Sequence, residues 1–517
     1  MLRDAEALDS AYDVVVAGAG TGGCVVAGRL AEAGLAVLLV EAGPPDTADP
    51  AIADAGAWVG LLGGPNDWGY AYAPAPAVGG RTIAIPRGRV LGGSSSINAM
   101  LWNRGHPSDY DGWAAAGATG WDFAAVLPYF RRAEDWEHGE TLLRGAGGPL
   151  RIETPSEPHP VAVALLAAAA ERGHPVLDDA NGPDNTGAAL ANLNKRGNRR
   201  WSVVDGYIRP LSANPDLTVL TGATVLDLLV SGGACTGLRL ALAGRVVAVR
   251  ARHEVVLASG AIGTPALLMR SGIGDPAELA RLGIPVRHAL PGIGRNLQDH
   301  PLLMGINFSA RAPLGPVRDN GGGAQLNWRS RADAHAPDLH AFVVQGSHAG
   351  PEIAATADLS GPVFGVSPGL MGSRSVGSLR LESAEPDGAV TIQPNFLAES
   401  ADRAALAGAI DTILDLASTA AFRDLGAVPL TPARRLGRAE AKTFVARACS
   451  TFFHTCGTCA MGTGPAAVVD PVLNLHGLQD LRVADASVIP VIPTGNTQAA
   501  VVMIAERAAD LIREAAR

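Results

Sequence analysis

The chain has 517 residues, of which 47% are hydrophobic and 18% charged; this composition is globular, and the length predicts two domains or one large elaborated unit. The formal net charge of −9 comes without a basic run, so we expect no nucleic-acid partner. No stretch approaches about 18 consecutive apolar residues, and residues 1–10 carry acids where a signal peptide has its apolar core. We therefore expect no membrane partner and a cytoplasmic location.

The stretch 12–43 predicts a strand, a glycine-rich turn, a helix and a second strand that ends at an acid. In the turn, Gly18 permits the sharp bend, Gly20 lets the backbone approach a pyrophosphate, and Gly23 lets helix and strand pack closely. Glu41 follows about 20 residues later, where an acidic side chain accepts hydrogen bonds from an adenosine ribose. The complete pattern predicts a dinucleotide site, for NAD or FAD, and the acid disfavours NADP.

Two loops follow this unit. Residues 44–80 are rich in Ala, Gly and Pro with interspersed aromatic side chains, which predicts an extended loop or lid. Residues 88–98 hold two adjacent glycines and three serines between apolar flanks. This second stretch predicts a buried loop that wraps a ligand.

The later segments divide into two kinds. Strands over 218–226, through 247–249 and over 255–258 are predicted to belong to the nucleotide-binding sheet, with a helix over 262–271. Between about 302 and 440 the pattern changes to broken strands and one helix, over 339–344, 378–381, 390–392 and 403–416. A last helix over 498–513 has apolar residues at a helical spacing and mixed charges, which predicts packing on the sheet rather than on a membrane surface.

The five cysteines do not form a disulfide framework, because their number is odd and low for this length. Cys456 and Cys459 form a CxxC pair, but no second CxxC and no histidine pair at zinc spacing accompanies it. We expect a buried structural pair and no metal site.

Several long motifs carry a resemblance to a known family. They are GRVLGGSSSINAMLWNRGHPSDYD at 88–111, GAIGTPALLMRSGIG at 260–274, PGIGRNLQDHP at 291–301, and a terminal block over 454–510. With these motifs the chain resembles, over essentially its whole length, the glucose–methanol–choline (GMC) family of FAD-dependent oxidoreductases.

The resemblance implies an α/β (α+β overall) fold, in which a Rossmann-like FAD-binding domain is interleaved with an antiparallel-sheet substrate domain. Residues 1–154, 211–301 and 441–517 would form the discontinuous FAD-binding domain. Residues 155–210 and 302–440 would form the substrate-binding domain.

The resemblance also assigns chemistry. His454 matches the family's active-site histidine and Asn496 its His-or-Asn partner. It implies oxidation of a primary alcohol, aryl or aliphatic, to the aldehyde by hydride transfer to flavin N5, with His454 as base and O2 or an electron carrier as final acceptor. An amide donor at Asn496 would hold the alcohol oxygen. Asparagine rather than histidine at this position favours the branch that oxidises simple alcohols.

The same matching implies further cofactor contacts. Together with those of the nucleotide motif they are Gly18, Gly20, Gly23, Glu41, Arg89, Gly92, Gly93, Ser94, Asn98, Val225, Asp485, Ala486, Thr497 and Gln498. Some members tether FAD through a histidine in the serine-rich loop. The matching position in this chain is Ile97, which cannot form that bond, so we expect non-covalent FAD.

Substrate identity rests on weaker signals. No cluster of acids between 300 and 440 implies a cationic substrate, and the candidates for an apolar pocket are Phe342, Phe364, Phe452 and Phe453. For each of these phenylalanines, packing in the core is the alternative. Two other kinds of enzyme also resemble this family: a hydroxynitrile lyase that keeps FAD without using its redox chemistry, and a light-driven fatty-acid photodecarboxylase. Retention of both His454 and an amide partner favours alcohol oxidation.

Overall fold

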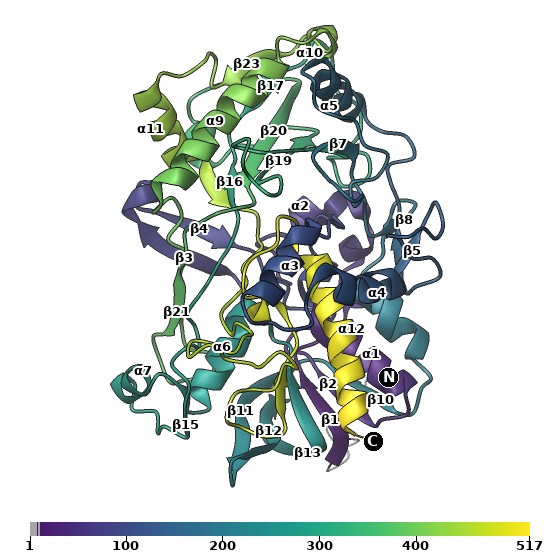
Figure 1. The fold of residues 1–517 in the computed structure, drawn as a ribbon, viewed down its shortest axis with the longest axis vertical. Helices are drawn as coiled ribbons and strands as arrows, with labels where there is room; N and C mark the ends of the chain where they lie inside the picture. Colours follow the sequence, from purple (N-terminus) through teal and green to yellow (C-terminus); the bar gives the residue numbers. More distant parts are fainter. Residues whose placement is uncertain (1–7, 9–10, 517) are drawn as a thin grey trace.

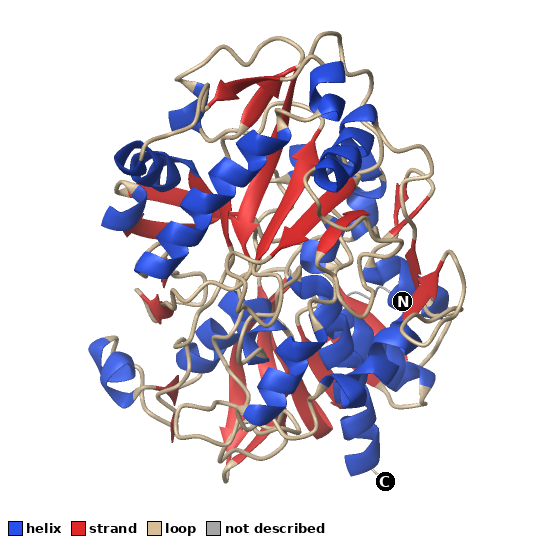
Figure 2. Cartoon of the chain, turned by 45° about the horizontal axis from the view of Figure 1, so that its top comes forward, coloured by secondary structure: helices blue, strands red, loops and turns tan. Residues whose placement is uncertain are grey.

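A computed structural model describes residue 8 and residues 11–516. The expectation of no signal peptide rests on residues 1–10, which lie outside the described residues apart from residue 8. The chain forms two halves, each built on its own sheet, stacked along the long axis of the molecule (Figures 1 and 2). The mixed fold of a Rossmann-type half and a sheet-based second half is confirmed.

The first sheet has seven strands in the order β10-β2-β1-β13-β12-β11, with β25 paired to β13. Their bounds are β1 Ala11–Ala17, β2 Val37–Val40, β10 Leu217–Leu220, β11 Ala223–Ser231, β12 Ala234–Leu242, β13 Arg245–Leu257 and β25 Leu481–Val483. β1 runs parallel to both neighbours, and Val15 pairs with Leu38 on one side and Val255 on the other. A continuous β-branched run is typical of such a strand because both faces are covered, and Val14–Val16 are fully buried.

Helices pack against this sheet and against one another beside it (Figure 1). They are α1 Thr21–Glu32, α4 Phe123–Ala133, α6 Gly260–Arg270 and the C-terminal α12 Thr497–Ala515. α12 packs against α1 and α4, and its Glu506 is fully buried. The Glu506 carboxylate accepts hydrogen bonds from Arg29, Arg132 and the Tyr207 hydroxyl. One buried acid at the end of the chain therefore joins three earlier segments.

The second sheet has eight strands in the order β23-β17-β20-β19-β18-β7, with β16 paired to β20 and β24. Every pair in it is antiparallel. The bounds are β7 Gly187–Leu190, β16 Pro301–Leu303, β17 Asn307–Ser309, β18 Ala324–Trp328, β19 Leu339–Val344, β20 Val363–Leu370, β23 Val428–Thr431 and β24 Cys449–Thr451. Helices α5 (Pro160–Glu171) and α9 (Ser400–Leu416) pack on it.

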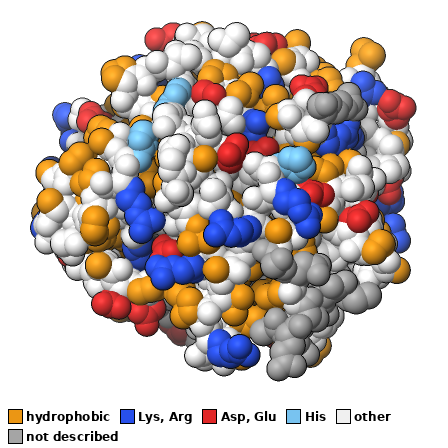
Figure 3. All heavy atoms as spheres, turned by 90° about the horizontal axis from the view of Figure 1, so that it is seen from below, with side chains coloured by type: hydrophobic (Ala, Val, Ile, Leu, Met, Phe, Trp, Pro, Cys, Tyr) orange, Lys and Arg blue, Asp and Glu red, His pale blue; other side chains and the backbone are white. Residues whose placement is uncertain are grey.

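The remaining elements are short and lie around the two sheets. They are the hairpins β3 Tyr70–Ala75 with β4 Arg81–Ile85 and β21 Ser378–Leu381 with β22 Val390–Gln393, the pairs β5 Glu134–Trp136 with β6 Leu150–Ile152, β8 Lys195–Arg196 with β9 Arg199–Arg200 and β14 Ile273–Gly274 with β15 His288–Ala289, and the helices α2 Trp58–Leu61, α3 Pro107–Ala115, α7 Pro276–Arg281, α8 Pro351–Ala354, α10 Ala420–Asp424 and α11 Arg438–Ala448. Among the described residues, no helix combines the length and apolar character needed to cross a lipid bilayer. Seen from below, side chains of both charges are scattered among apolar ones (Figure 3).

One strand pair decides where the reacting groups lie. β16 pairs with β24 so that Pro301 is opposite Thr451. His300 directly precedes β16, and His454 lies three residues beyond the end of β24. Two segments about 150 residues apart in sequence therefore place these imidazoles side by side, 2.9 Å apart between their Nδ1 atoms.

Candidate active site

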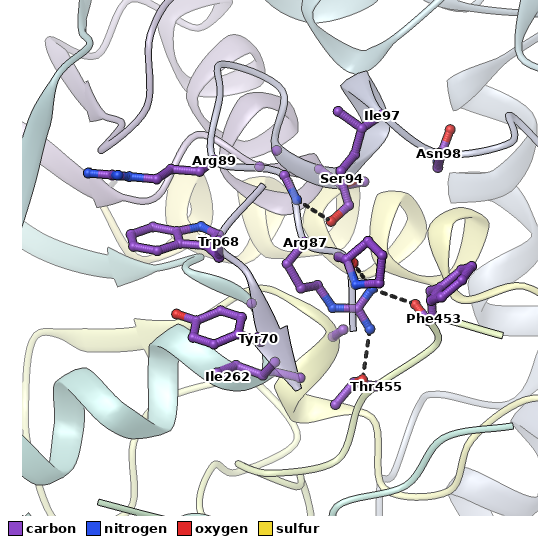
Figure 4. Close-up of a pocket in the computed structure, with 18 of the residues that line it drawn as sticks. Trp68, Tyr70, Arg87, Arg89, Ser94, Ile97, Asn98, Ile262, Phe453 and Thr455 are labelled. Carbon is purple, nitrogen blue, oxygen red and sulfur yellow. Dashed lines mark hydrogen bonds between the residues drawn. The ribbon is translucent and has the colours of Figure 1, made fainter. Parts of the chain in front are cut away.

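A cavity of about 1030 Å³ is lined by residues of both halves of the molecule. It extends from the turn after β1 to the segment after β24, and Figure 4 shows the wall formed by the β3–β4 hairpin and the serine-rich loop. Pockets for drug-sized ligands typically measure about 300–1000 Å³. The cavity therefore has the size expected for an extended cofactor together with a small substrate.

The N-terminus of α1 forms one end of this cavity. Thr21 and Gly22 line it, and the N-cap residue Gly20 offers no side chain that could bond the first N–H groups. The first turn also holds no acid. Free backbone N–H groups and the positive end of the helix dipole suit a pyrophosphate.

The glycines around this turn have separate structural reasons. A Cβ on Gly93 would lie 2.7 Å from the Cα of Gly20, so the serine-rich loop and the turn meet backbone to backbone. A Cβ on Gly23 would lie 1.9 Å from the carbonyl oxygen of Gly18, which agrees with a packing role for Gly23. Gly92 has φ +89°, which permits the turn that enters the serine-rich loop.

Glu41, at the end of β2, lines the cavity next to this turn. Its carboxylate accepts hydrogen bonds from the backbone N–H groups of Ala19 (3.2 Å) and Gly43 (2.8 Å). Burial raises the pKa of Glu41 to about 7, although these hydrogen bonds and the charge of Arg89 act in the opposite direction. The position suits a group that accepts hydrogen bonds from a sugar hydroxyl.

Two aromatic side chains from the expected lid also line the cavity at this end (Figure 4). The guanidinium of Arg89 lies 4.9 Å from the ring centroid of Trp68, which stacks on Tyr70 at 5.9 Å. Trp68 and Tyr70 are not among the site residues predicted from sequence. The signal was the aromatic content of 44–80, which does not by itself say which rings face inward.

The structure brings most of the predicted site residues to this one cavity. Those that line it are Gly18, Gly20, Glu41, Arg89, Gly93, Ser94, Asn98, Val225, Phe342, Phe452, Phe453, His454, Asp485, Ala486, Asn496, Thr497 and Gln498. Gly23 and Gly92 lie behind the wall, in the packing and turn positions just described.

Phe364 does not reach the cavity. Its side chain is fully buried on β20, 5.4 Å from the ring of Phe308 and 5.6 Å from that of Phe422. These three rings belong to the hydrophobic core of the second half. Phe364 is therefore a core residue and not a residue of the substrate pocket.

His454 and Asn496 meet at the cavity wall. The Asn496 side-chain amide nitrogen lies 3.0 Å from Nε2 of His454. Its oxygen accepts a hydrogen bond from the amide of Asn103 (2.8 Å), which also donates to Gln325 (3.1 Å). Asn103 therefore orients Asn496 so that its N–H points to His454.

A single carboxylate holds the backbone of this region. Oδ1 of Asp299 accepts hydrogen bonds from the backbone N–H groups of His300 and His454, both at 2.8 Å. Oδ2 accepts hydrogen bonds from the hydroxyl groups of Tyr72 and Thr451. Asp299 is 2% exposed, so these bonds are shielded from water.

The environment keeps His454 neutral. Burial is the largest cause that lowers its pKa well below the ordinary value, and the nearby His300, Arg87 and His340 act in the same direction. Arg87 is held nearby by hydrogen bonds to the carbonyl oxygen of Phe453 and the hydroxyl of Thr455, both at 2.7 Å (Figure 4). A neutral imidazole with a lone pair toward the cavity is suited to accept a proton.

A series of aromatic side chains, Phe452, Phe342 and His348, follows His454 along the cavity wall, and we refer to it as the ring series. Phe452 stacks on His454 with centroids 5.4 Å apart, Phe342 lies 5.5 Å from Phe452, and His348 lies 5.7 Å from Phe342. Among the described residues that line the cavity, the acids are Glu41, Asp387 and Asp485. None of these carboxylates belongs to the ring series.

Ile97 occupies the position at which a covalent flavin link would need a histidine. It lines the cavity and packs with Ile52, Leu61 and Val90 in a small apolar cluster. Nothing in this side chain can form a bond to a ring system. In the serine-rich loop, Ser94 lines the cavity, whereas the hydroxyls of Ser95 and Ser96 donate to backbone carbonyl oxygens of the loop itself.

Two family models, both described as GMC oxidoreductase, match residues 12–302 and 373–505. A GMC-type oxidoreductase of Mycobacterium tuberculosis is 37% identical over 98% of this chain and 100% of its own length. Human mitochondrial choline dehydrogenase is 35% identical over 97% of this chain and 90% of its own. The crystal structure of pyridoxine 4-oxidase from Mesorbium loti superposes with a TM-score of 0.92 and 34% identity, covering 96% of this chain and 98% of that one.

Proposed function

Because the chain belongs to the GMC oxidoreductase family, we propose that it oxidises a neutral primary alcohol, aryl or aliphatic, to the aldehyde, with His454 as the base. In general terms, the protein is an FAD-dependent oxidoreductase that acts on CH–OH donors. The observation that carries the proposal is the convergence of Nε2 of His454 and the amide of Asn496, 3.0 Å apart, on the cavity wall.

The lining residues fit FAD. The uncapped start of α1 and the close backbone approach of Gly20 and Gly93 suit a pyrophosphate, and Glu41 suits the adenosine ribose. We assign Val225 to the adenine, Arg89, Ser94 and Asn98 to the pyrophosphate and flavin, and the late segment, with Asp485, Ala486, Thr497 and Gln498, to the flavin side. When bound, FAD accepts the hydrogen that leaves the carbinol carbon with two electrons.

The chain's own residues then perform the proton chemistry. Nε2 of His454 accepts the hydroxyl proton of the alcohol, which breaks the O–H bond and leaves the electron pair on oxygen. When the alcohol binds, its oxygen replaces Nε2 of His454 as the acceptor of the Asn496 amide N–H. This exchange frees the Nε2 lone pair for the hydroxyl proton and holds the oxygen beside the base. Asn103 holds the amide in the donating orientation. Burial of His454 at 7% exposure excludes most water from this step.

The charges near His454 favour a neutral substrate. The positive charge of Arg87 acts on His454, and the described lining residues provide no carboxylate in the ring series around Phe342 and Phe452. A quaternary ammonium group would therefore lack a negative partner there. Choline, which the names of several relatives contain, would find aromatic faces but no carboxylate around its ammonium group.

Anaerobic reduction of the bound flavin tests the proposal. The visible spectrum of the purified protein is recorded without oxygen, alcohols of the benzylic, furanic, aliphatic and choline classes are added, and air follows. Bleaching by a neutral primary alcohol is expected, and the return of colour in air decides between O2 and a separate electron carrier as acceptor. A yellow protein that no alcohol bleaches would contradict the proposal and favour a non-redox or light-driven use of FAD.

A further inference from the structure

His300 and His454 form a buried pair of imidazoles. Their Nδ1 atoms lie 2.9 Å apart and their ring planes are nearly perpendicular, at 87°. His300 is fully buried and His454 is 7% exposed. At this distance one Nδ1 carries the proton and donates, and the other accepts.

The meeting of the two rings is fixed by the backbone rather than by chance side-chain orientation. Asp299 accepts hydrogen bonds from the backbone N–H groups of both histidines. The backbone N–H of Phe452 also donates to the carbonyl oxygen of His300. The two segments are therefore joined on both sides of the imidazole pair.

The direction of the Nδ1–Nδ1 bond depends on which ring carries its proton on Nδ1. Burial lowers the pKa of His300 to about 3, so its ring is neutral and one of its two nitrogens can accept. Within the described part of the chain, Nε2 of His300 makes no hydrogen bond, and Nδ1 faces His454.

The hydrogen bonds at Asn496 give the direction. The amide of Asn103 donates to the oxygen of Asn496, so the amide nitrogen of Asn496 donates to Nε2 of His454. A nitrogen that accepts a hydrogen bond carries no proton. Neutral His454 therefore has its proton on Nδ1, facing His300.

We propose that His300 is a positioning residue for the reaction: it accepts the Nδ1–H of His454 and so keeps the Nε2 lone pair of His454 directed at Asn496 and the cavity. The proposal rests on the proposed function of His454 as base. In serine hydrolases a carboxylate holds the equivalent tautomer. In this chain the carboxylate of Asp299 accepts from the backbone N–H of His454 and not from its ring. The neutral imidazole of His300 accepts the ring N–H instead.

No other described group can replace His300 in this position. The ring of Phe452 stacks on the face of His454, Arg87 is a donor, and His340 bonds through its Nδ1 to Asn327. Loss of the His300 acceptor would leave the Nδ1–H of His454 buried and unpaired. His454 would then shift its proton to Nε2, where it could not accept one from the alcohol.

The test compares three proteins: wild type, His300→Leu, which removes the acceptor, and His300→Asn, whose side-chain oxygen can accept near the position of Nδ1. ¹⁵N NMR of histidine-labelled protein, with His454→Ala for assignment, reports which nitrogen carries the proton. We expect the Nδ1–H form of His454 in wild type and His300→Asn, and a population of the Nε2–H form in His300→Leu. This readout does not depend on turnover.

The kinetic arm measures flavin reduction at saturating alcohol. We expect the flavin of His300→Leu to be reduced roughly 10- to 100-fold more slowly, the range typical when an outer partner that orients a histidine is lost. Its FAD content and KM should be unchanged. His300→Asn should recover most of the reduction rate. A wild-type His454 that carries its proton on Nε2 overturns the proposal, and this result stands even if His300→Leu does not fold. A wild-type reduction rate in His300→Leu overturns it as well. Wild-type reduction in His454→Ala would instead refute the proposed function.

Discussion

Removal of the Asp299 carboxylate tests how the reacting segments are held. In Asp299→Ala, the backbone N–H groups of His300 and His454 both lose the acceptor that they share at 2.8 Å. The hydroxyl groups of Tyr72 and Thr451 lose their acceptor too, but Tyr72 keeps the hydroxyl of Thr455 at 2.8 Å. The damage therefore falls on the two backbone N–H groups and on the buried hydroxyl of Thr451.

The structure gives the size of the effect. A buried donor left without a partner costs about 1–3 kcal/mol, so three orphaned donors lower the free energy of unfolding by roughly 3–9 kcal/mol. The same change frees the backbone of His454. Since a displacement of about 1 Å can slow catalysis about 10²-fold, we expect flavin reduction to fall by at least about tenfold.

Asp299→Asn is the matched control. Its remaining oxygen can accept from both backbone N–H groups, and its amide can donate to the hydroxyl groups of Tyr72 and Thr451, which rotate to accept. We expect Asp299→Asn to lose much less of both quantities. Thermal unfolding of the FAD-loaded proteins and anaerobic stopped-flow reduction measure them. Equal losses in the Ala and Asn variants would refute this reasoning, because charge rather than hydrogen bonding would then be the cause.

Three further experiments address the same site. His454→Ala is expected to slow flavin reduction by about 10²–10⁴-fold while the protein stays yellow. The control is His159→Asn, in which an amide oxygen replaces the ring nitrogen that caps α5, and this variant should reduce normally. A loss of reduction in both variants would remove the specific role of His454. Because burial and the positive Arg87 lower the pKa of His454, its neutral base form persists as the pH falls through about 6.5. We therefore expect kcat/KM to stay level through that pH and to decline only below it. A decline of kcat/KM centred above pH 7 would contradict the assignment of His454 as base. Since Ile97 cannot bond a flavin, acid precipitation should leave white protein and a yellow supernatant, whereas yellow precipitate would show a covalent link.

The local elements were largely predictable from sequence. The expected strands at 339–344, 378–381 and 390–392 coincide with β19, β21 and β22 to within a residue, because each is a short apolar or alternating segment between turn residues. The expected strand over 218–226 is instead divided into β10 and β11 at Gly222, whose φ of +68° turns the chain. β21 and β22 also form a sheet of their own rather than part of the larger one. Which strands pair depends on distant partners, which local patterns do not contain.

The division of the chain between the two halves shows the same limit. The expected substrate segment 302–440 stops short of β24, which pairs with β16 in the second sheet. Within the expected segment 155–210, Val204–Ile208 packs on α1 of the first half, where a Cβ on Gly28 would lie 2.8 Å from the carbonyl oxygen of Tyr207. Composition changes locate the halves but not the strands that cross between them.

For the site, motifs in the sequence were informative where one loop carries the chemistry and uninformative where tertiary contacts do. The glycine turn and Glu41 follow from the strand–turn–helix pattern alone. His300, Asp299 and Asn103 lie within or beside recognised motifs, yet only their contacts with His454 and Asn496 reveal what they do. Phe342 and Phe364 look alike in sequence, and the packing of β19 and β20 sends one to the cavity and the other to the core.

The joining of the first and last segments has a consequence for biosynthesis. β25 pairs with the middle of the first sheet, and Glu506 of α12 bonds Arg29 of α1, so the first half cannot close until α12 has left the ribosome. At about 5–20 residues per second, translation of a chain this long takes on the order of 30–100 s. During that time the apolar strand β1 and the glycine turn lack their final neighbours. The nascent chain is therefore expected to depend on chaperone protection, and loss of its last helix should yield aggregates rather than a smaller folded enzyme.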